Sequence, residues 1–167
     1  MSVWFSASAV VPALVAAWGL KSSGQAWLTM SVQLGFVVGA LASAVLNLAD
    51  RIPGRWLFAV SSLLAGTATL LIPAAGASFL SVLFLRLLTG VFLAGVYPVG
   101  MKIMATWTRE DRGTGVGLLV GALTLGSAAP HLLKALGGIG DWKPVLLLSG
   151  TLAIAGGLLA SLFVHEG

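Results

Sequence analysis

The sequence predicts an all-α protein that lies in a membrane, and its composition and its hydropathy pattern both point to this class. Of the 167 residues, 58% are hydrophobic and 8% are charged, whereas a soluble domain carries about a quarter charged residues because its surface faces water. The apolar stretches are long and continuous, without the polar–apolar alternation of a membrane barrel. The membrane-spanning segments are therefore predicted to be helices, since a spanning segment must satisfy every backbone polar group internally.

Six apolar stretches are candidates to cross a bilayer, which takes about 20 residues per helix. The short connections between them hold turn-forming and charged residues, as expected at a water interface. The whole chain, residues 1–167, is therefore predicted to form a single six-helix transmembrane bundle. The first stretch begins almost at Met1 and carries Pro12, so we expect a span that is too short to cross unaided or that lacks its first turns. The predicted spans are residues 3–20, 26–48, 56–74, 79–107, 113–136 and 144–164.

Basic residues in the connections predict the orientation. The second and fourth connections hold four arginines, against three lysines near the other connections, so the positive-inside rule places these two connections and both termini in the cytoplasm. The net charge of +4 is scattered along the chain, which excludes a basic patch for nucleic acid. The chain has no cysteine, hence no disulfide and no thiolate metal site, and we expect neither a metal nor a cofactor.

Two pairs of similar segments indicate an internal repeat. AVVPAL around Pro12 resembles GVYPVG around Pro98, and GFVVGAL (35–41) resembles GLLVGAL (117–123). Three helices per copy would insert the copies with opposite topology, a 3+3 inverted repeat found in many secondary transporters. A sequence rich in Gly, Val and Leu also produces such matches by chance, so both explanations stay open.

Glycines at every fourth position predict close helix packing. Such a spacing places them on one helical face and lets another helix approach. The residues concerned are Gly35 and Gly39 in the second predicted helix and Gly113, Gly117 and Gly121 in the fifth.

Two motifs give the sequence a family resemblance. NLADRIPGRW (47–56) is similar to the loop G-x-L-a-D-r-x-G-r between helices two and three of major facilitator superfamily transporters, and RLLTG (86–90) is similar to the R-x-x-x-G pattern of helix four. With the six spans, the chain resembles the N-terminal half of such a transporter over nearly its whole length. Leu46 replaces the leading glycine of the loop, and Pro53 is an extra residue. The loop positions are filled by Leu48, Asp50, Arg51, Gly54 and Arg55.

The resemblance implies that this loop latches the inner ends of the two transporter halves. Asp50, Arg51, Gly54 and Arg55 are the expected latch residues, because a carboxylate beside guanidinium groups can pair with them and with a neighbouring helix end. A plain positive-inside anchor with a tight turn is the alternative. The carboxylate favours the latch, since anchoring needs only the arginines.

An ionisable residue inside a membrane is a functional candidate by default. Arg86 and Tyr97 share a helical face with Gly90 and are expected to line a cavity, with a structural role for Arg86 as the alternative. Lys102 lies on nearly the opposite face, and we expect it to reach the cytoplasmic surface. Pro12 and Pro98 are expected to kink their helices. Further cavity candidates, for which helix packing is the alternative, are Gln33, which shares a face with Asn47, and Thr124, Ser127 and His131.

These features favour a secondary transporter that moves a small polar or anionic solute by alternating access. No Asp or Glu lies within a predicted span, and GALTLGSAAP (121–130) does not match the family's antiporter signature, so neither a buried-carboxylate proton relay nor drug–proton antiport is supported. No catalytic constellation indicates an enzyme. We expect the cell (inner) membrane as the location and a second six-helix half as the partner, either the rest of a longer chain or a second copy. A non-transporting membrane scaffold is the alternative function.

Overall fold

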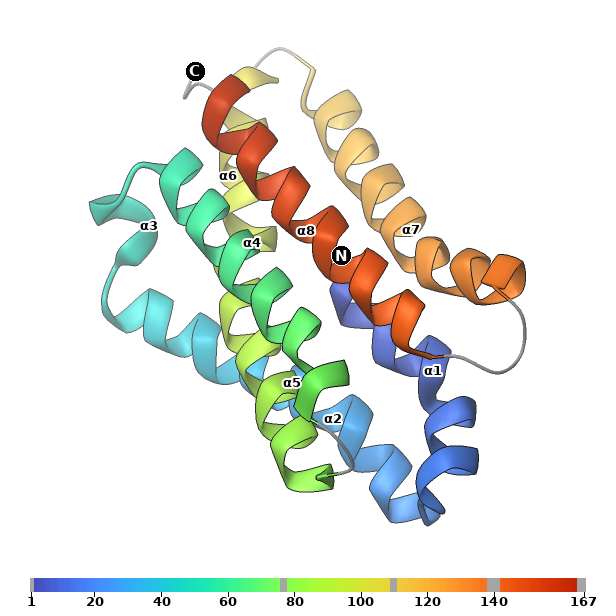
Figure 1. Ribbon diagram of the computed structural model, residues 1–167. Coiled ribbons are helices and arrows are strands. Elements are labelled where there is room, and N and C mark those ends of the chain that lie inside the picture. Colours follow the sequence, from blue (N-terminus) through green and yellow to red (C-terminus); the bar gives the residue numbers. More distant parts are fainter. Residues whose placement is uncertain (1, 76–77, 109–110, 138–141, 165–167) are drawn as a thin grey trace.

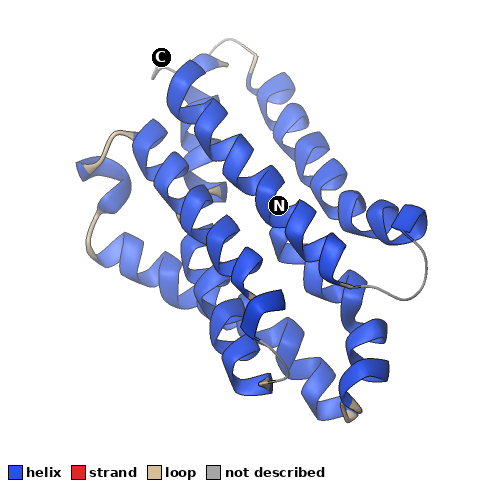
Figure 2. Cartoon of the chain, viewed as in Figure 1, coloured by secondary structure: helices blue, strands red, loops and turns tan. Residues whose placement is uncertain are grey.

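The computed structural model describes residues 2–75, 78–108, 111–137 and 142–164, and all regular structure in these ranges is helical (Figure 2). This confirms the predicted all-α class. Figure 1 shows the helices packed side by side as one bundle. The elements are α1 (Ser2–Trp18), α2 (Ser22–Val45), α3 (Leu48–Arg51), α4 (Gly54–Leu71), the 3-10 turn η1 (Pro73–Ala75), α5 (Phe79–Leu93), α6 (Tyr97–Trp107), α7 (Arg112–Gly137) and α8 (Lys143–Phe163).

Five helical segments of the described chain are long and apolar enough to cross a membrane. α1 has 17 residues, which corresponds to about 25 Å of helix, less than the ~30 Å hydrocarbon core. Length and composition thus support five of the six predicted spans, and the first helix is the exception. The five segments are Ser22–Val45, Gly54–Ala75, Phe79–Trp107, Gly113–Leu132 and Lys143–Phe163.

Two helices end where a residue adopts the left-handed conformation. α1 is followed by Gly19, which has a φ of +61°, the usual backbone of a helix C-terminal glycine. α2 ends at Val45, three residues before the predicted end of its span, because Asn47 adopts φ 51° and ψ 40°, a conformation that asparagine tolerates better than most residues. The chain then forms the short helix α3 before it enters α4.

The helix predicted over residues 79–107 is broken into α5 and α6. The N–H groups of Gly95 and Val96 donate to carbonyls three residues back, Phe92 and Leu93, both at 3.0 Å. Pro98, which has no N–H to donate, occupies the first turn of α6, where a proline fits without loss of a helical bond. Pro12 lies within α1.

Glycines let the helix backbones touch. A Cβ at Gly35 would overlap the Leu87 carbonyl oxygen, and one at Gly90 would overlap the Val32 carbonyl oxygen, so α2 and α5 are in backbone contact at these points. α4 and α8 meet in the same way, since a Cβ at Gly66 would lie 2.8 Å from the Gly150 carbonyl oxygen. The close packing predicted at Gly35 and Gly39 is therefore present.

The glycines of α7 differ. A Cβ at Gly117 or Gly121 meets no atom within 4 Å, and one at Gly113 meets only the Asp111 carboxylate at 3.7 Å. Among the described residues, these three glycines therefore meet no other helix, whereas packing within the six-helix unit was one of the explanations for their spacing.

Tryptophans mark the two ends of the bundle. α3, the end of α6 and the end of α8 lie at the upper side in Figure 1, whereas the α1–α2 and α4–α5 connections lie at the lower side. Trp56 and Trp107 lie next to the upper connections and are 48% and 63% exposed. Trp18 and Trp142 pack edge to face near the lower end with ring centroids 5.6 Å apart. Such belts are typical of the two membrane–water interfaces.

We expect Gly90→Ala to lower the free energy of unfolding by about 1–3 kcal/mol, because the added methyl group pushes α5 away from α2. Gly121→Ala is the matched control, since its methyl group meets open space. Denaturant titration in detergent micelles measures both. Equal stability of the two variants would contradict the backbone contact.

Candidate functional site

Arg86 on α5 is fully buried, with 1% of its surface exposed. Its Nη1 donates to the Val3 carbonyl at 2.9 Å and its Nη2 to the Trp4 carbonyl at 3.0 Å, while Nε has no partner. Both carbonyls belong to the start of α1. The guanidinium group therefore connects α5 to α1 across more than 80 residues of sequence.

These contacts correct the expected position of Arg86. The sequence predicts that Arg86 lines an open cavity, whereas the structure buries its side chain and directs both terminal nitrogens at α1. The structural alternative fits this conformation. An anionic solute therefore finds no free guanidinium group here.

Buried hydroxyl groups form further polar contacts between helices. Ser2 Oγ donates to the Ser149 carbonyl on α8 at 3.4 Å, and Thr69 Oγ1 on α4 lies 3.4 Å from Thr89 Oγ1 on α5. Such hydroxyl groups commonly join helices within a membrane. These hydroxyl groups are not among the predicted site residues, although Ser and Thr inside apolar helices are their signal in the sequence.

Tyr97 follows the break between α5 and α6 and is half-buried. It lines a pocket of about 290 Å³ between α6 and α7. The α6 side also contributes Met101, Met104 and Thr108, and the α7 side contributes Val116 and Leu119. The pocket is thus mainly apolar, with the phenol group of Tyr97 and the hydroxyl group of Thr108 as polar side-chain groups.

The other cavity candidates do not join this pocket. Gln33, Thr124 and His131 are exposed and Ser127 is half-buried, and none of the four is among the residues that line the Tyr97 pocket. The hydroxyl groups of Thr124 and Ser127 donate to carbonyls of their own helix, at 2.9 and 2.7 Å. The structure therefore does not bring these residues together with Tyr97.

At the upper end of the bundle, Asp50 pairs with Lys102. Lys102 Nζ lies 2.7 Å from Asp50 Oδ1 and donates to the Ala49 carbonyl at 2.6 Å. The pair joins α3 to α6 and lines a pocket of about 320 Å³ that also includes Arg51 and Gly54. The hydrogen bond and the charge of Lys102 lower the pKa of Asp50 below its ordinary value.

Within the described residues, the arginines of this loop do not form the ion pair with Asp50. The Arg55 guanidinium lies 5.4 Å from the centroid of the Trp56 ring, which is a cation–π contact. Arg51 is exposed and forms no ion pair in the described part of the chain. The partner of Asp50 within this chain is therefore Lys102, which the sequence predicts to be a solvent-facing lysine, and not the two arginines.

The long apolar helices define an integral membrane protein, in which a buried arginine connects two of the helices. The family model of the Major Facilitator Superfamily matches residues 1–167, the entire chain. The chain therefore belongs to the major facilitator superfamily, whose members are transporters and not enzymes. No curated protein matches the sequence.

We expect loss of the Arg86 guanidinium to loosen the start of α1. The Ser6→Cys variant carries a single thiol, because the chain has no cysteine of its own. In this variant, Arg86→Met should raise the rate at which maleimide labels that thiol by at least about tenfold. Each bond from a charged donor contributes about 1.5–3 kcal/mol. Arg86→Lys should give an intermediate rate, since one nitrogen cannot reach two carbonyls equally well.

The control is Ser62→Cys on α4, which is also buried and whose labelling rate should not change with Arg86→Met. An unchanged rate at Ser6→Cys would contradict the clamp on α1.

We expect the Lys102→Met substitution to raise the pKa of Asp50 toward its ordinary value, because the ion pair stabilises the carboxylate. A lowered pKa means that the pair persists at neutral pH and is lost as the pH falls through that pKa. NMR titration of the Asp50 carboxyl carbon measures the shift. Arg51→Met is the control, and a larger shift with it than with Lys102→Met would assign the partnership to the arginine.

Proposed function

We propose that this chain is one half of a secondary transporter that moves a small polar solute across the cell (inner) membrane by alternating access. The observation that carries this proposal is the match of the family model to all 167 residues. The proposed half is the N-terminal one, because the loop NLADRIPGRW follows the second helix. Both termini are proposed to be cytoplasmic, on the side of the arginine-bearing connections.

The helix pairing supports the proposed 3+3 repeat and the sixth span. The six predicted spans are, in order, α1, α2, α4, the α5–α6 segment, α7 and α8. In a 3+3 repeat, the first three spans correspond to the last three. The α2–α5 pair is then equivalent to the α7–α1 pair, and the α4–α8 pair is equivalent to itself. All three pairs are in contact in the bundle. Contact between equivalent pairs is what two copies with opposite topology would produce.

The Tyr97 pocket is the proposed solute site of this half. It adjoins a break in a membrane helix, and interrupted helices commonly form the binding sites of transporters. An anionic solute was expected because Arg86 was predicted to line the cavity. Since Arg86 donates to α1 instead, this reason for an anionic solute no longer applies. A neutral solute with a group that bonds to the Tyr97 hydroxyl fits the described residues better. Gln33, Thr124, Ser127 and His131 remain candidates to line the water path on the exposed faces of α2 and α7.

The proposed partner is a second six-helix half, which is either a continuation of the chain or a second copy. α7 supports this partner, because Gly117 and Gly121 leave open space and the neighbouring Leu118 and Leu125 are 61% and 74% exposed. The loop residues Asp50, Arg51, Gly54 and Arg55 are proposed to latch onto that half.

Uptake into proteoliposomes tests this function. The complete gene product is screened with radiolabelled hexoses, polyols and amides, and with small carboxylates for comparison. For an accepted neutral solute, we expect Tyr97→Phe to raise KM about two- to tenfold, the effect of one lost hydrogen bond, with Leu162→Ala on the exposed surface of α8 as the control. Absence of uptake for every solute would favour the membrane scaffold, and uptake of carboxylates alone would contradict the neutral class.

A further inference from the structure

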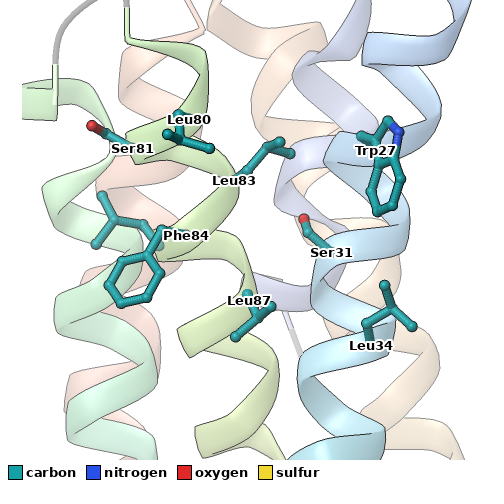
Figure 3. A pocket seen from close by; sticks show the side chains of 9 residues that line it. Trp27, Ser31, Leu34, Leu80, Ser81, Leu83, Phe84 and Leu87 are labelled. Atoms are coloured by element: carbon teal, nitrogen blue, oxygen red, sulfur yellow. The ribbon is translucent and has the colours of Figure 1, made fainter.

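We propose that a groove between α2 and α5 binds one membrane phospholipid, with an acyl chain lying in the groove. The groove has a volume of about 730 Å³. Figure 3 shows Trp27 and Leu34 on the α2 side and Leu83 and Leu87 on the facing side of α5, while Phe84 borders the pocket on the flank of α5 that points away from α2. This inference concerns a site separate from the Tyr97 pocket and does not rest on the proposed transport activity.

The groove persists because the two helices are fixed at two points. A Cβ at Gly24 would lie 3.6 Å from the Phe79 ring near the start of both helices, and Gly35 meets the Leu87 backbone further along. Between these contacts the small side chain of Ser31 lies in the space that a larger residue would fill. The walls of the groove are thus set by backbone packing and not by movable loops.

The polarity of the lining excludes a polar solute. Ser31 and Ser81 are the hydroxyl-bearing residues of the groove, and both are already bonded within their own helices. Ser31 Oγ donates to the Leu28 carbonyl at 3.2 Å, and Ser81 Oγ donates to Ser78 Oγ at 3.1 Å. A ligand of this groove therefore gains mainly from burial of apolar surface.

Several of the large apolar side chains that line the groove are exposed. Leu80 is 76% exposed, Phe84 is 60% exposed and Trp27 is 50% exposed. They lie inside two of the membrane-spanning segments, and the lining from Leu80 to Leu87 covers about 10 Å along the helix axis. Because this length is within one leaflet of a ~30 Å hydrocarbon core, an acyl chain fits its depth.

The end of the groove nearest the lower connections adds polar groups that match a phospholipid head. Lys21 and Ser23 precede Trp27 on the α2 side and are exposed, and Ser78 precedes Leu80 on the α5 side. A lysine beside an anionic lipid phosphate contributes electrostatic attraction, and a tryptophan at this depth is typical of the interface. Polar groups at one end and an apolar groove below them define an amphiphile with its head at the Lys21 end.

Native mass spectrometry of the complete gene product, extracted from vesicles of phosphatidylglycerol and phosphatidylethanolamine, tests the proposal. We expect one phospholipid to survive delipidation in the wild-type protein. Leu83→Trp, which fills the groove, and Leu34→Ala, which removes part of the α2 wall, should each reduce its retention about tenfold. Leu162→Trp on α8, outside the groove, is the matched control. Equal retention in all four proteins would overturn the site.

Two further measurements identify the occupant. Lys21→Gln should reduce retention of phosphatidylglycerol about fivefold and leave diacylglycerol, which has no phosphate, unchanged; equal loss of both would overturn the role of the phosphate. A photo-crosslinking residue at Leu80 should form an adduct with phospholipid. An adduct with a second copy of the chain or with another protein segment would show that protein covers the groove, and would overturn the proposal.

Discussion

The backbone contact between α2 and α5 is the constraint on which the rest of the bundle depends. Helices in hydrocarbon gain little from burying apolar side chains, because the lipid is equally apolar, so close packing must hold them together. Gly90 provides this contact by leaving room for the Val32 carbonyl. Arg86 lies one turn earlier on nearly the same helical face, so a helix that approaches at Gly90 brings the arginine beside its neighbours. The spacing R-x-x-x-G thus has a direct physical reason in this chain.

The buried charge of Arg86 makes the position of α1 specific. An isolated charge in a low-dielectric interior is costly unless it is hydrogen-bonded, and within the described residues the Val3 and Trp4 carbonyls are the acceptors of its side chain. A different packing of α1 would leave the guanidinium without these acceptors. The arginine therefore selects one arrangement of α1 against α5 as well as contributing to its stability, and a movement of α1 in a transport cycle would have to replace both bonds.

The sequence was sufficient for the class, for most of the spans and for the α2 glycines, because hydropathy and fourfold spacing are local properties. It was insufficient for the partner of Asp50, which is Lys102, 52 residues away, since the left-handed Asn47 that ends α2 and reshapes the loop is not visible in a hydropathy pattern. Helical periodicity grouped Arg86 with Gly90 and Tyr97, but it revealed neither the break before Tyr97 nor that α1 occupies the space beside Arg86.

Other contacts were missed although the sequence contains their signal. Gly150 and Gly157 are seven residues apart and so share a face of α8, and Ser62 and Gly66 are four apart on α4. The structure packs these two faces together, because a Cβ at Gly157 would lie 2.9 Å from Ser62 Cβ. A search for glycines four residues apart does not find this contact. On α4 a serine, Ser62, takes the place of one glycine, and on α8 the two glycines are seven residues apart.

The break between α5 and α6 separates the ion pair at Asp50 from the packing of α5 against α2. α6 is a continuous helix from Tyr97 to Trp107, with Tyr97 in its pocket at one end and Lys102, which holds α3, one to two turns further along. The turn at residues 94–96 separates α6 from the glycine contacts that fix α5 against α2. Tyr97 and Lys102 therefore lie on one continuous helix, so α6 is the element that joins the Tyr97 pocket to the loop that carries Asp50.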